Sequence, residues 1–182
     1  MRDIDDHWND IAGSVQPLAY TLKFELAQRW VRFHSLPESR RYPDSDADMR
    51  AVIDRHNEIL SAVFTLDEKL YFVVPAWAEE SSIKAQAKGY IHWRDVLADE
   101  DDPESNNRLH VKTAAWSVGC LDWAISASAN DDLHGFMAIG AGSRVLYHPY
   151  DGGMDLILPS ALERARLQCE FAQYLSSHPA GL

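Results

Sequence analysis

The sequence predicts an α+β protein with a mainly antiparallel sheet and about three helices packed on it. Several short segments alternate apolar and polar residues, which is typical of strands that bury one face. Sequences rich in glycine or proline separate neighbouring segments of this kind, as they do in hairpins. The strict alternation of strands and helices that builds a parallel sheet is absent, so we expect antiparallel pairing.

The first two strands are predicted near the N-terminus. Residues 18–26 carry Leu, Tyr or Phe at every second position, and residues 29–34 alternate in a similar way. Ala27 and Gln28, which lie between them, are few enough for a hairpin turn, although they lack the favoured Asn-Gly sequence. Further strands are expected at 69–77, 90–94, 109–116 and 154–158, and a hairpin at 136–139 and 144–148.

Three helices are predicted, at 45–64, 119–130 and 160–176. In the first, apolar residues recur at steps of three and four, and Ser45 or Asp44 can provide the N-cap. Ser160 and Glu163 have the spacing of a capping box at the start of the third. Residues 1–16 are expected to form a solvated arm or a short helix, because four of the first ten residues are Asp.

The composition indicates one globular domain over residues 1–182. Hydrophobic residues make up 46% of the chain and charged residues 25%, which is ordinary for a packed domain. The net charge of -11 disfavours binding to nucleic acid and to anionic membranes, and it favours a basic partner. Two scattered cysteines, together with an acidic N-terminus that no long apolar run follows, predict a cytoplasmic protein without a membrane segment.

Residues 147–155 form the densest group of side chains with potential chemistry. They place His148, Tyr150, Asp151 and Asp155 around a tight turn, and a His beside carboxylates could act in acid–base catalysis. The alternative is structural: Asp151 would bond the turn backbone, and the two glycines after it would adopt positive φ. No nucleophile motif, phosphate-binding loop or set of metal ligands accompanies the turn, so neither a cofactor nor a metal is predicted.

A second candidate group is basic. Arg32, His34, Arg40 and Arg41 fall in one short stretch of an otherwise acidic chain. Together with the 147–155 turn they could line a pocket that holds an anion or a carboxylate of a partner. The alternative is that they form ion pairs within the protein along a solvated strand edge.

Residues 95–107 are expected to form an exposed acidic loop. They carry six acidic side chains, no basic one, and Pro103. The segment lacks the glycine and the terminal glutamate of a calcium-binding loop, which leaves solvation or the docking of a basic partner. The residues expected to bind such a partner are Asp99, Glu100, Asp101, Asp102 and Glu104.

Four segments of the chain carry a family resemblance: 22–26, the loop 32–42, residues 147–157 and residues 175–182. Together they resemble a bacterial family known as domain of unknown function 3885, and the likeness runs from about Leu18 to Leu182. Residues 150–155, Tyr-Asp-Gly-Gly-Met-Asp, are similar to a Tyr-Asp-Asp-Arg-Gly type signature of that family, with Gly where other branches carry Arg. The resemblance implies no established activity. It implies an association with loci of secreted toxins of the Rhs and Vgr types, and from that a role as an immunity protein.

Three functions are therefore open at the level of the sequence. The first is a protein-binding module, most concretely an immunity protein that blocks a toxin or effector domain of the same cell in a 1:1 complex. The second is a small hydrolase-like enzyme that uses His148, Asp151 and Asp155, with Arg32 and His34 from a neighbouring strand. The third is an accessory or structural protein of a secretion locus, dimeric through a sheet edge. Nothing in the sequence predicts the oligomeric state itself.

Overall fold

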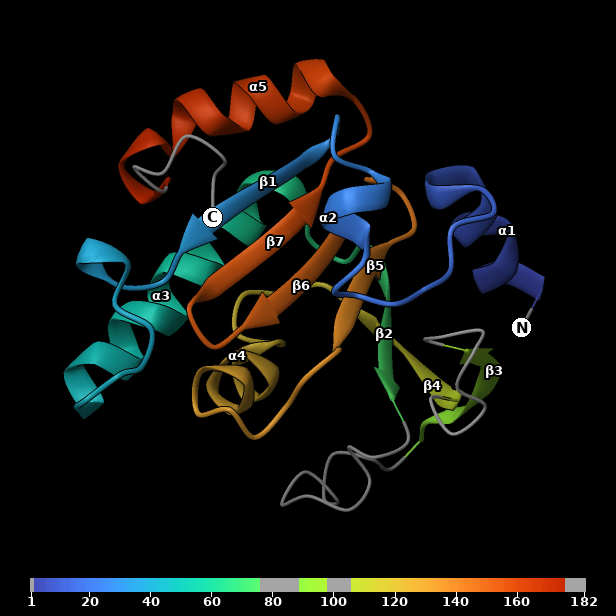
Figure 1. Ribbon diagram of the computed structural model, residues 1–182, viewed down its shortest axis with the longest axis horizontal. Coiled ribbons are helices and arrows are strands. Elements are labelled where there is room, and N and C mark those ends of the chain that lie inside the picture. The colour runs from blue at the N-terminus through green and yellow to red at the C-terminus, as the bar shows by residue number, and fades with distance from the viewer. Residues whose placement is uncertain (1, 76–88, 98–105, 176–182) are drawn as a thin grey trace.

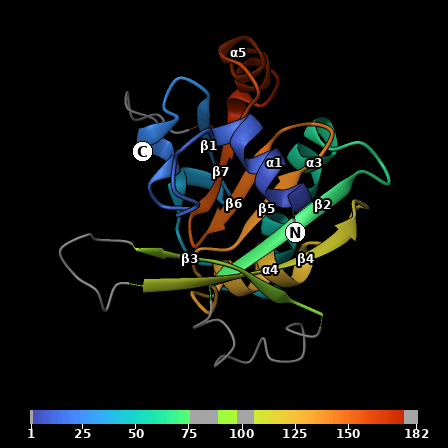
Figure 2. The ribbon, with the colours of Figure 1, turned by 90° about the vertical axis from the view of Figure 1, so that its right-hand side faces the viewer.

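The computed structural model describes residues 2–75, 89–97 and 106–175, which contain a seven-stranded sheet with helices on both faces (Figure 1). The strand order is β1-β7-β6-β5-β2-β4-β3, and each neighbouring pair is antiparallel. The strands are β1 (Trp30–His34), β2 (Lys69–Pro75), β3 (Ile91–Leu97), β4 (Asn106–Ala115), β5 (Met137–Gly140), β6 (Leu146–Tyr150) and β7 (Gly153–Ile157). Figure 2 shows β3 and β4 as the outer pair at one end of the sheet. The predicted α+β class with an antiparallel sheet is confirmed.

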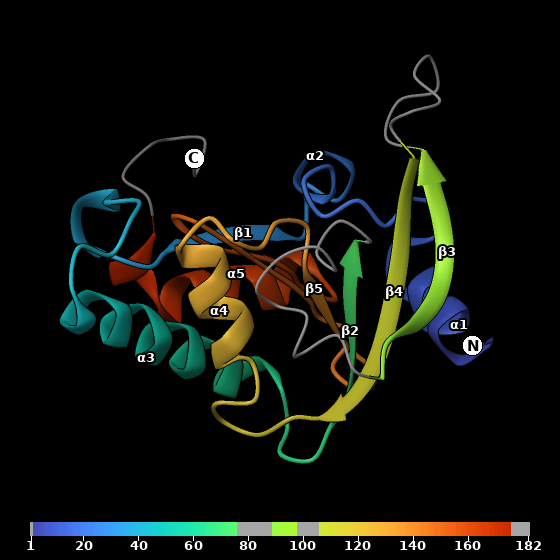
Figure 3. The same ribbon diagram turned by 90° about the horizontal axis from the view of Figure 1, so that it is seen from below.

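The larger hydrophobic core lies on the face covered by α3 (Asp46–Val63), α4 (Asp122–Ala129) and α5 (Ala161–Glu170). Apolar residues of α3 and α4, such as Ile59 and Ile125, pack there against strand residues such as Phe33. The second core lies on the opposite face, beneath α1 (Arg2–Ala12) and α2 (Leu22–Glu25). Figure 3, viewed along the sheet, places α2 and α3 on opposite sides of the strands. Short 3₁₀ turns follow at Pro37–Ser39 and Ala172–Tyr174.

Most of the predicted elements are present. The strands expected at 29–34, 69–77, 90–94, 109–116 and 154–158 and the hairpin at 136–148 correspond to β1, β2, β3, β4, β7 and β5–β6. Ser45 is the N-cap of α3, since its hydroxyl accepts a hydrogen bond from the Asp48 amide at 3.2 Å. Ser160 caps α5 through the Glu163 amide at the same distance. The capping residues therefore predicted the starts of both helices, and the structure confirms them.

The strand predicted at 18–26 is wrong, and so is the hairpin after it. The segment forms a turn followed by the short helix α2, in which Leu22 is buried while Tyr20 and Phe24 are 53% and 71% exposed. Leu18, Leu22 and Leu26 also recur every four residues, and this helical period prevailed over the period of two. β1 instead pairs with β7, from the far end of the chain.

The prediction of about three helices was too low, because the described residues contain five α-helices. The additional two are α1 and α2. Helix α1 lies where an arm or a short helix was predicted, and α2 lies where a strand was predicted. The acidic loop predicted at 95–107 is wrong at both of its ends, and residues 98–105 lie outside the described residues. Its first residues, through Leu97, belong to β3, and Asn106 and Asn107 belong to β4.

Helix α1 is fixed to the second face of the sheet at several points. Trp8 is 1% exposed, and its ring meets the Trp93 ring edge-on at 5.9 Å. The Asp5 carboxylate accepts hydrogen bonds from the Trp93 indole, at 2.8 Å, and from the Arg94 guanidinium. The Arg29 guanidinium donates to the Ile11 carbonyl near the helix end. Of the two alternatives for the N-terminus, the structure has the helix, and its apolar side is part of the core.

Candidate functional site

A row of polar side chains crosses three adjacent strands on the face that carries α2. Arg32 on β1 is opposite Asp155 on β7, and Asp155 is opposite His148 on β6, so the three side chains share one face. The Arg32 guanidinium binds the Asp155 carboxylate through two hydrogen bonds of 2.7 and 2.8 Å. Both side chains are largely buried, with exposures of 14% and 8%. The cation that could have held a ligand anion is thus bound to a carboxylate of its own chain.

The Arg32 guanidinium stays charged near neutral pH. Burial lowers the pKa of Arg32, but the hydrogen bonds and the charge of Asp155 outweigh burial, so the pKa is raised above its ordinary value. The Tyr150 ring lies against the guanidinium, with 4.4 Å between the ring centroid and the guanidinium carbon. Burial raises the pKa of the Tyr150 hydroxyl, so this group stays neutral beside the pair. The arrangement suits a structural ion pair better than a proton-transfer site.

The next row of the sheet contains His34, Gly153 and Tyr150. A Cβ at Gly153 would lie 2.1 Å from the Phe33 carbonyl oxygen, so a larger residue would force β1 away from β7. Neither this glycine nor Gly152 has a positive φ, so the predicted reason for the two glycines is wrong. Glycine is required at position 153 because β1 and β7 approach closely there. The sequence of the turn alone does not indicate this approach.

His148 is neutral, and its hydrogen bonding fixes the tautomer. Its Nδ1 lies 2.8 Å from the Phe136 carbonyl oxygen, which can only accept, so Nδ1 carries the ring proton. Nε2 therefore has the free lone pair. Burial lowers the pKa of His148, while the charge of Asp155 and the bond to the Phe136 carbonyl act in the opposite direction. In His34, burial together with the charges of Arg32 and Arg55 also lowers the pKa.

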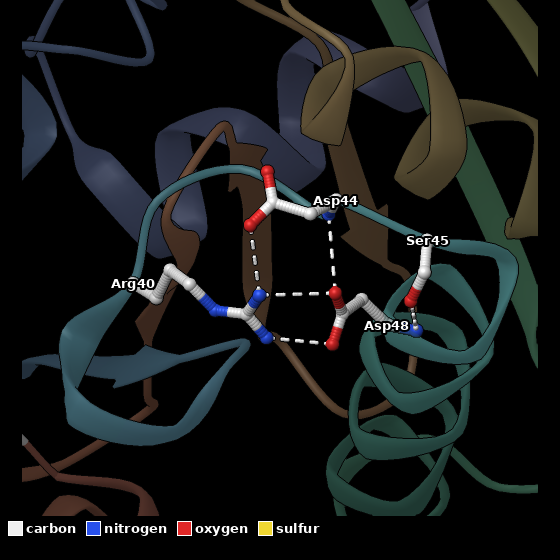
Figure 4. A network of polar contacts seen from close by, with 4 residues as sticks. All are labelled: Arg40, Asp44, Ser45 and Asp48. Atoms are coloured by element: carbon white, nitrogen blue, oxygen red, sulfur yellow. Dashed lines mark hydrogen bonds and ion pairs between the residues drawn. The ribbon is translucent and has the colours of Figure 1, made fainter.

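The other predicted site residues form two separate groups. Asp151, in the turn between β6 and β7, accepts from Arg41 at 2.6 Å and from the Tyr42 hydroxyl at 3.1 Å. It thus holds the 35–44 loop, which is not the role in the turn backbone that the structural alternative assigned to it. Arg40 points elsewhere and binds Asp44 and Asp48 at the start of α3, beside the Ser45 cap (Figure 4).

The structure therefore divides the eight predicted pocket residues into three sets. Arg32, His34, His148, Tyr150 and Asp155 lie together on one face of β1, β7 and β6. Arg41 and Asp151 pair at the turn, and Arg40 pairs at the N-terminus of α3. The structure does not bring all eight residues to one pocket, and each of the three arginines binds an aspartate within the protein.

His148 and Tyr150 also line a cleft next to the ion pair. We call it the His148 cleft; its volume is about 250 Å³. Its walls are residues 17–20, 133–135 and 148–150, together with Pro75, Asn107 and Leu109. Most of the lining is apolar, and Tyr20 at its lip is about half exposed. The sequence did not predict this cleft, because its walls come from five separate parts of the chain.

The structure also contains a buried chain of hydrogen bonds that the sequence did not predict. His56 on α3 contacts the Ser35 hydroxyl through Nε2 and the Tyr147 hydroxyl through Nδ1, each at 2.7 Å. The three residues are 2% exposed or less, so the Ser–His contact, although it has the spacing of a nucleophile and its base, cannot reach a substrate. His56 follows Val52 by one helical turn and precedes Ile59 and Leu60 on the same face, a spacing that could have placed it in the core.

The acidic residues Asp99, Glu100, Asp101, Asp102 and Glu104 lie outside the described residues. Within residues 2–75, 89–97 and 106–175, no group of three or more His, Cys, Asp or Glu has the arrangement of a metal site. The helices of the described part are too short or too polar to cross a membrane.

Comparison with known proteins identifies the family. The family model described as "Domain of unknown function (DUF3885)" matches residues 18–179. The chain belongs to this family. The match contains the whole polar row, the sheet, and the His148 cleft except for Pro17, whereas helix α1 precedes it. No curated protein and no solved structure matches the chain.

Proposed function

We propose that this DUF3885 protein acts by binding another protein, most concretely as an immunity protein that occludes a basic toxin or effector domain in a 1:1 complex. The observation that carries the proposal is the internal pairing of cations. Arg32, Arg40 and Arg41 each bind an aspartate of the chain itself. The chain has a net charge of -11, so an incoming molecule meets an excess of negative charge. A basic protein surface is complementary to such a field.

The same contacts argue against the hydrolase-like alternative. Asp155, one of its proposed catalytic carboxylates, is engaged twice by Arg32, and Asp151 is engaged by Arg41. His56 has a serine partner, but the site is closed to solvent. These features favour a surface that binds over a site that turns over substrate.

The test begins with capture of partners from the native host on the tagged full-length chain, at low and at moderate salt. Each captured protein is then expressed in a sensitive host with and without this chain. We expect one stoichiometric partner that stops growth when expressed alone, is neutralised by co-expression, and dissociates more readily as salt rises. Replacement of Asp99, Glu100, Asp101 and Asp102 by Asn should slow association. Absence of a specific partner at both salt concentrations, or a partner without toxicity, would contradict the proposal.

A further inference from the structure

We infer that the His148 cleft receives one Trp or Tyr side chain from a basic protein partner. This inference rests on the proposed protein-binding function and names the place where the partner is anchored. Its first basis is size. A dry cavity of about 150 Å³ is large enough for benzene, and the cleft of about 250 Å³ therefore has room for one larger aromatic group. Aromatic side chains of this kind carry much of the energy of protein interfaces.

The second basis is the chemistry of the lining. Leu18, Pro75, Leu109 and Pro149 offer apolar contacts, and Tyr20 is about half exposed at the lip. The polar side chains of the lining include Asn107, His134 and His148. In His148 the Nδ1 proton is held by the Phe136 carbonyl, so that Nε2 is an acceptor. An aromatic ring with an N–H or O–H group is complementary to this lining, because it buries apolar surface and can donate one hydrogen bond to Nε2. Trp and Tyr have this combination, whereas Phe and Leu lack the donor.

The third basis is charge around the cleft. Asp131 and Asp132 are exposed and directly precede the wall residues 133–135. An apolar cleft beside acidic residues is complementary to an aromatic side chain that lies among Lys or Arg. This complementarity selects a side chain of a basic protein over an anionic metabolite as the occupant.

The cleft is tested by NMR titration of the ¹⁵N-labelled full chain with the capped peptide Lys-Trp-Lys. We expect saturable shifts of backbone amides at Ala19, Leu109 and Gly135 and a shift of the His148 Nε2 resonance. The same peptide with 1-methyltryptophan, which lacks the indole N–H, should bind ~5-fold more weakly, since about 1 kcal/mol is usual for one hydrogen bond. The capped peptide Glu-Trp-Glu should bind more weakly than Lys-Trp-Lys.

Two exposed aromatic residues provide matched variants. Tyr20→Ala alters the lip of the cleft, whereas Phe24→Ala removes a more exposed ring that is not part of its lining. We expect Tyr20→Ala to weaken Lys-Trp-Lys binding several-fold and Phe24→Ala to leave it unchanged. Shifts outside the cleft, equal effects of the two variants, or binding of free indole without binding of the peptide would overturn the inference.

The same variants separate this inference from the proposed function. If a neutralised toxin is captured and its complex is weakened by Tyr20→Ala but not by Phe24→Ala, both conclusions are supported. If the complex is insensitive to Tyr20→Ala, the anchor is wrong while the immunity function stands. If no partner is found but the peptide shifts the cleft residues and discriminates the two variants, the cleft is supported and the immunity function fails.

Discussion

The buried His56 should make the stability of this protein depend on pH in a defined window. Burial lowers the pKa of His56 from an ordinary value of 6.5 to about 3, and the charge of Arg55 acts in the same direction. Between these two values the unfolded chain binds a proton at this residue and the folded chain does not. The free energy of unfolding therefore falls as pH falls through the window. Above pH 6.5 His56 is neutral in both states and causes no loss of stability.

The magnitude follows from the width of the window. Each pH unit corresponds to about 1.36 kcal/mol for one proton, so a shift from pH 6.5 to pH 4.5 costs about 2.7 kcal/mol. The variant His56→Gln removes the titration and keeps a polar side chain between Ser35 and Tyr147. Urea unfolding at pH 7.0 and 4.5 should show that the native protein loses about 2.7 kcal/mol more than the variant.

Comparison with the variant removes the contributions of other groups, including His34 and His148, whose pKa values are also lowered. Titration of the His56 ring by NMR gives an independent reading. Equal losses in the two proteins, or a His56 ring that becomes protonated near pH 6.5 while the protein stays folded, would refute the reasoning.

Three further predictions concern packing at the candidate site and beneath α1, and each is tested by urea unfolding at pH 7. Asp155→Asn should destabilise the protein by about 3–5 kcal/mol, because the buried Arg32 loses its counter-charge, whereas Asp151→Asn at the exposed Arg41 should cost about 0–1 kcal/mol; similar losses would contradict the assigned burial. Gly153→Ala should cost about 1–3 kcal/mol through the clash with Phe33, and Gly142→Ala, whose added Cβ meets Glu68 at an ordinary 3.5 Å, should cost less. Trp8→Ala should cost about 3–5 kcal/mol, and a loss below about 1 kcal/mol would show that α1 does not cover the sheet in solution.

The sequence predicted what local chemistry determines. The capping serines of α3 and α5 bond to amides three residues further on, and the paired residues of the hairpin β5–β6 lie within about ten residues of each other. The sequence patterns that predict these features therefore lie within short segments. The segment 18–26 was misassigned because its apolar residues fit two periods at once, and only packing against the sheet decides between them. The exposed Tyr20 and Phe24 were taken for buried strand residues for this reason.

The candidate site depends on contacts that no short window contains. Arg32 and Asp155 are 123 residues apart in the sequence and become partners only because β1 pairs with β7. Both were predicted as pocket residues, with internal ion pairs as the alternative for Arg32, and the structure shows such a pair. The sequence does not decide between a pocket and an ion pair, because the outcome depends on the register of two distant strands.

The position of the ion pair also bears on function. A bidentate Arg–carboxylate pair on a largely buried sheet face orders the strands that carry it, and it leaves little free charge for an incoming ligand. The adjoining His148 cleft is mostly apolar, the Nε2 of His148 is an acceptor, and the exposed Asp131 and Asp132 directly precede its wall residues 133–135. A mostly apolar cleft in a protein with a net charge of -11 is suited to the proposed binding of a side chain from a basic protein. Recognition by such a surface needs no group to change its charge, which agrees with the neutral state of His148 and with the fixed charge of Arg32.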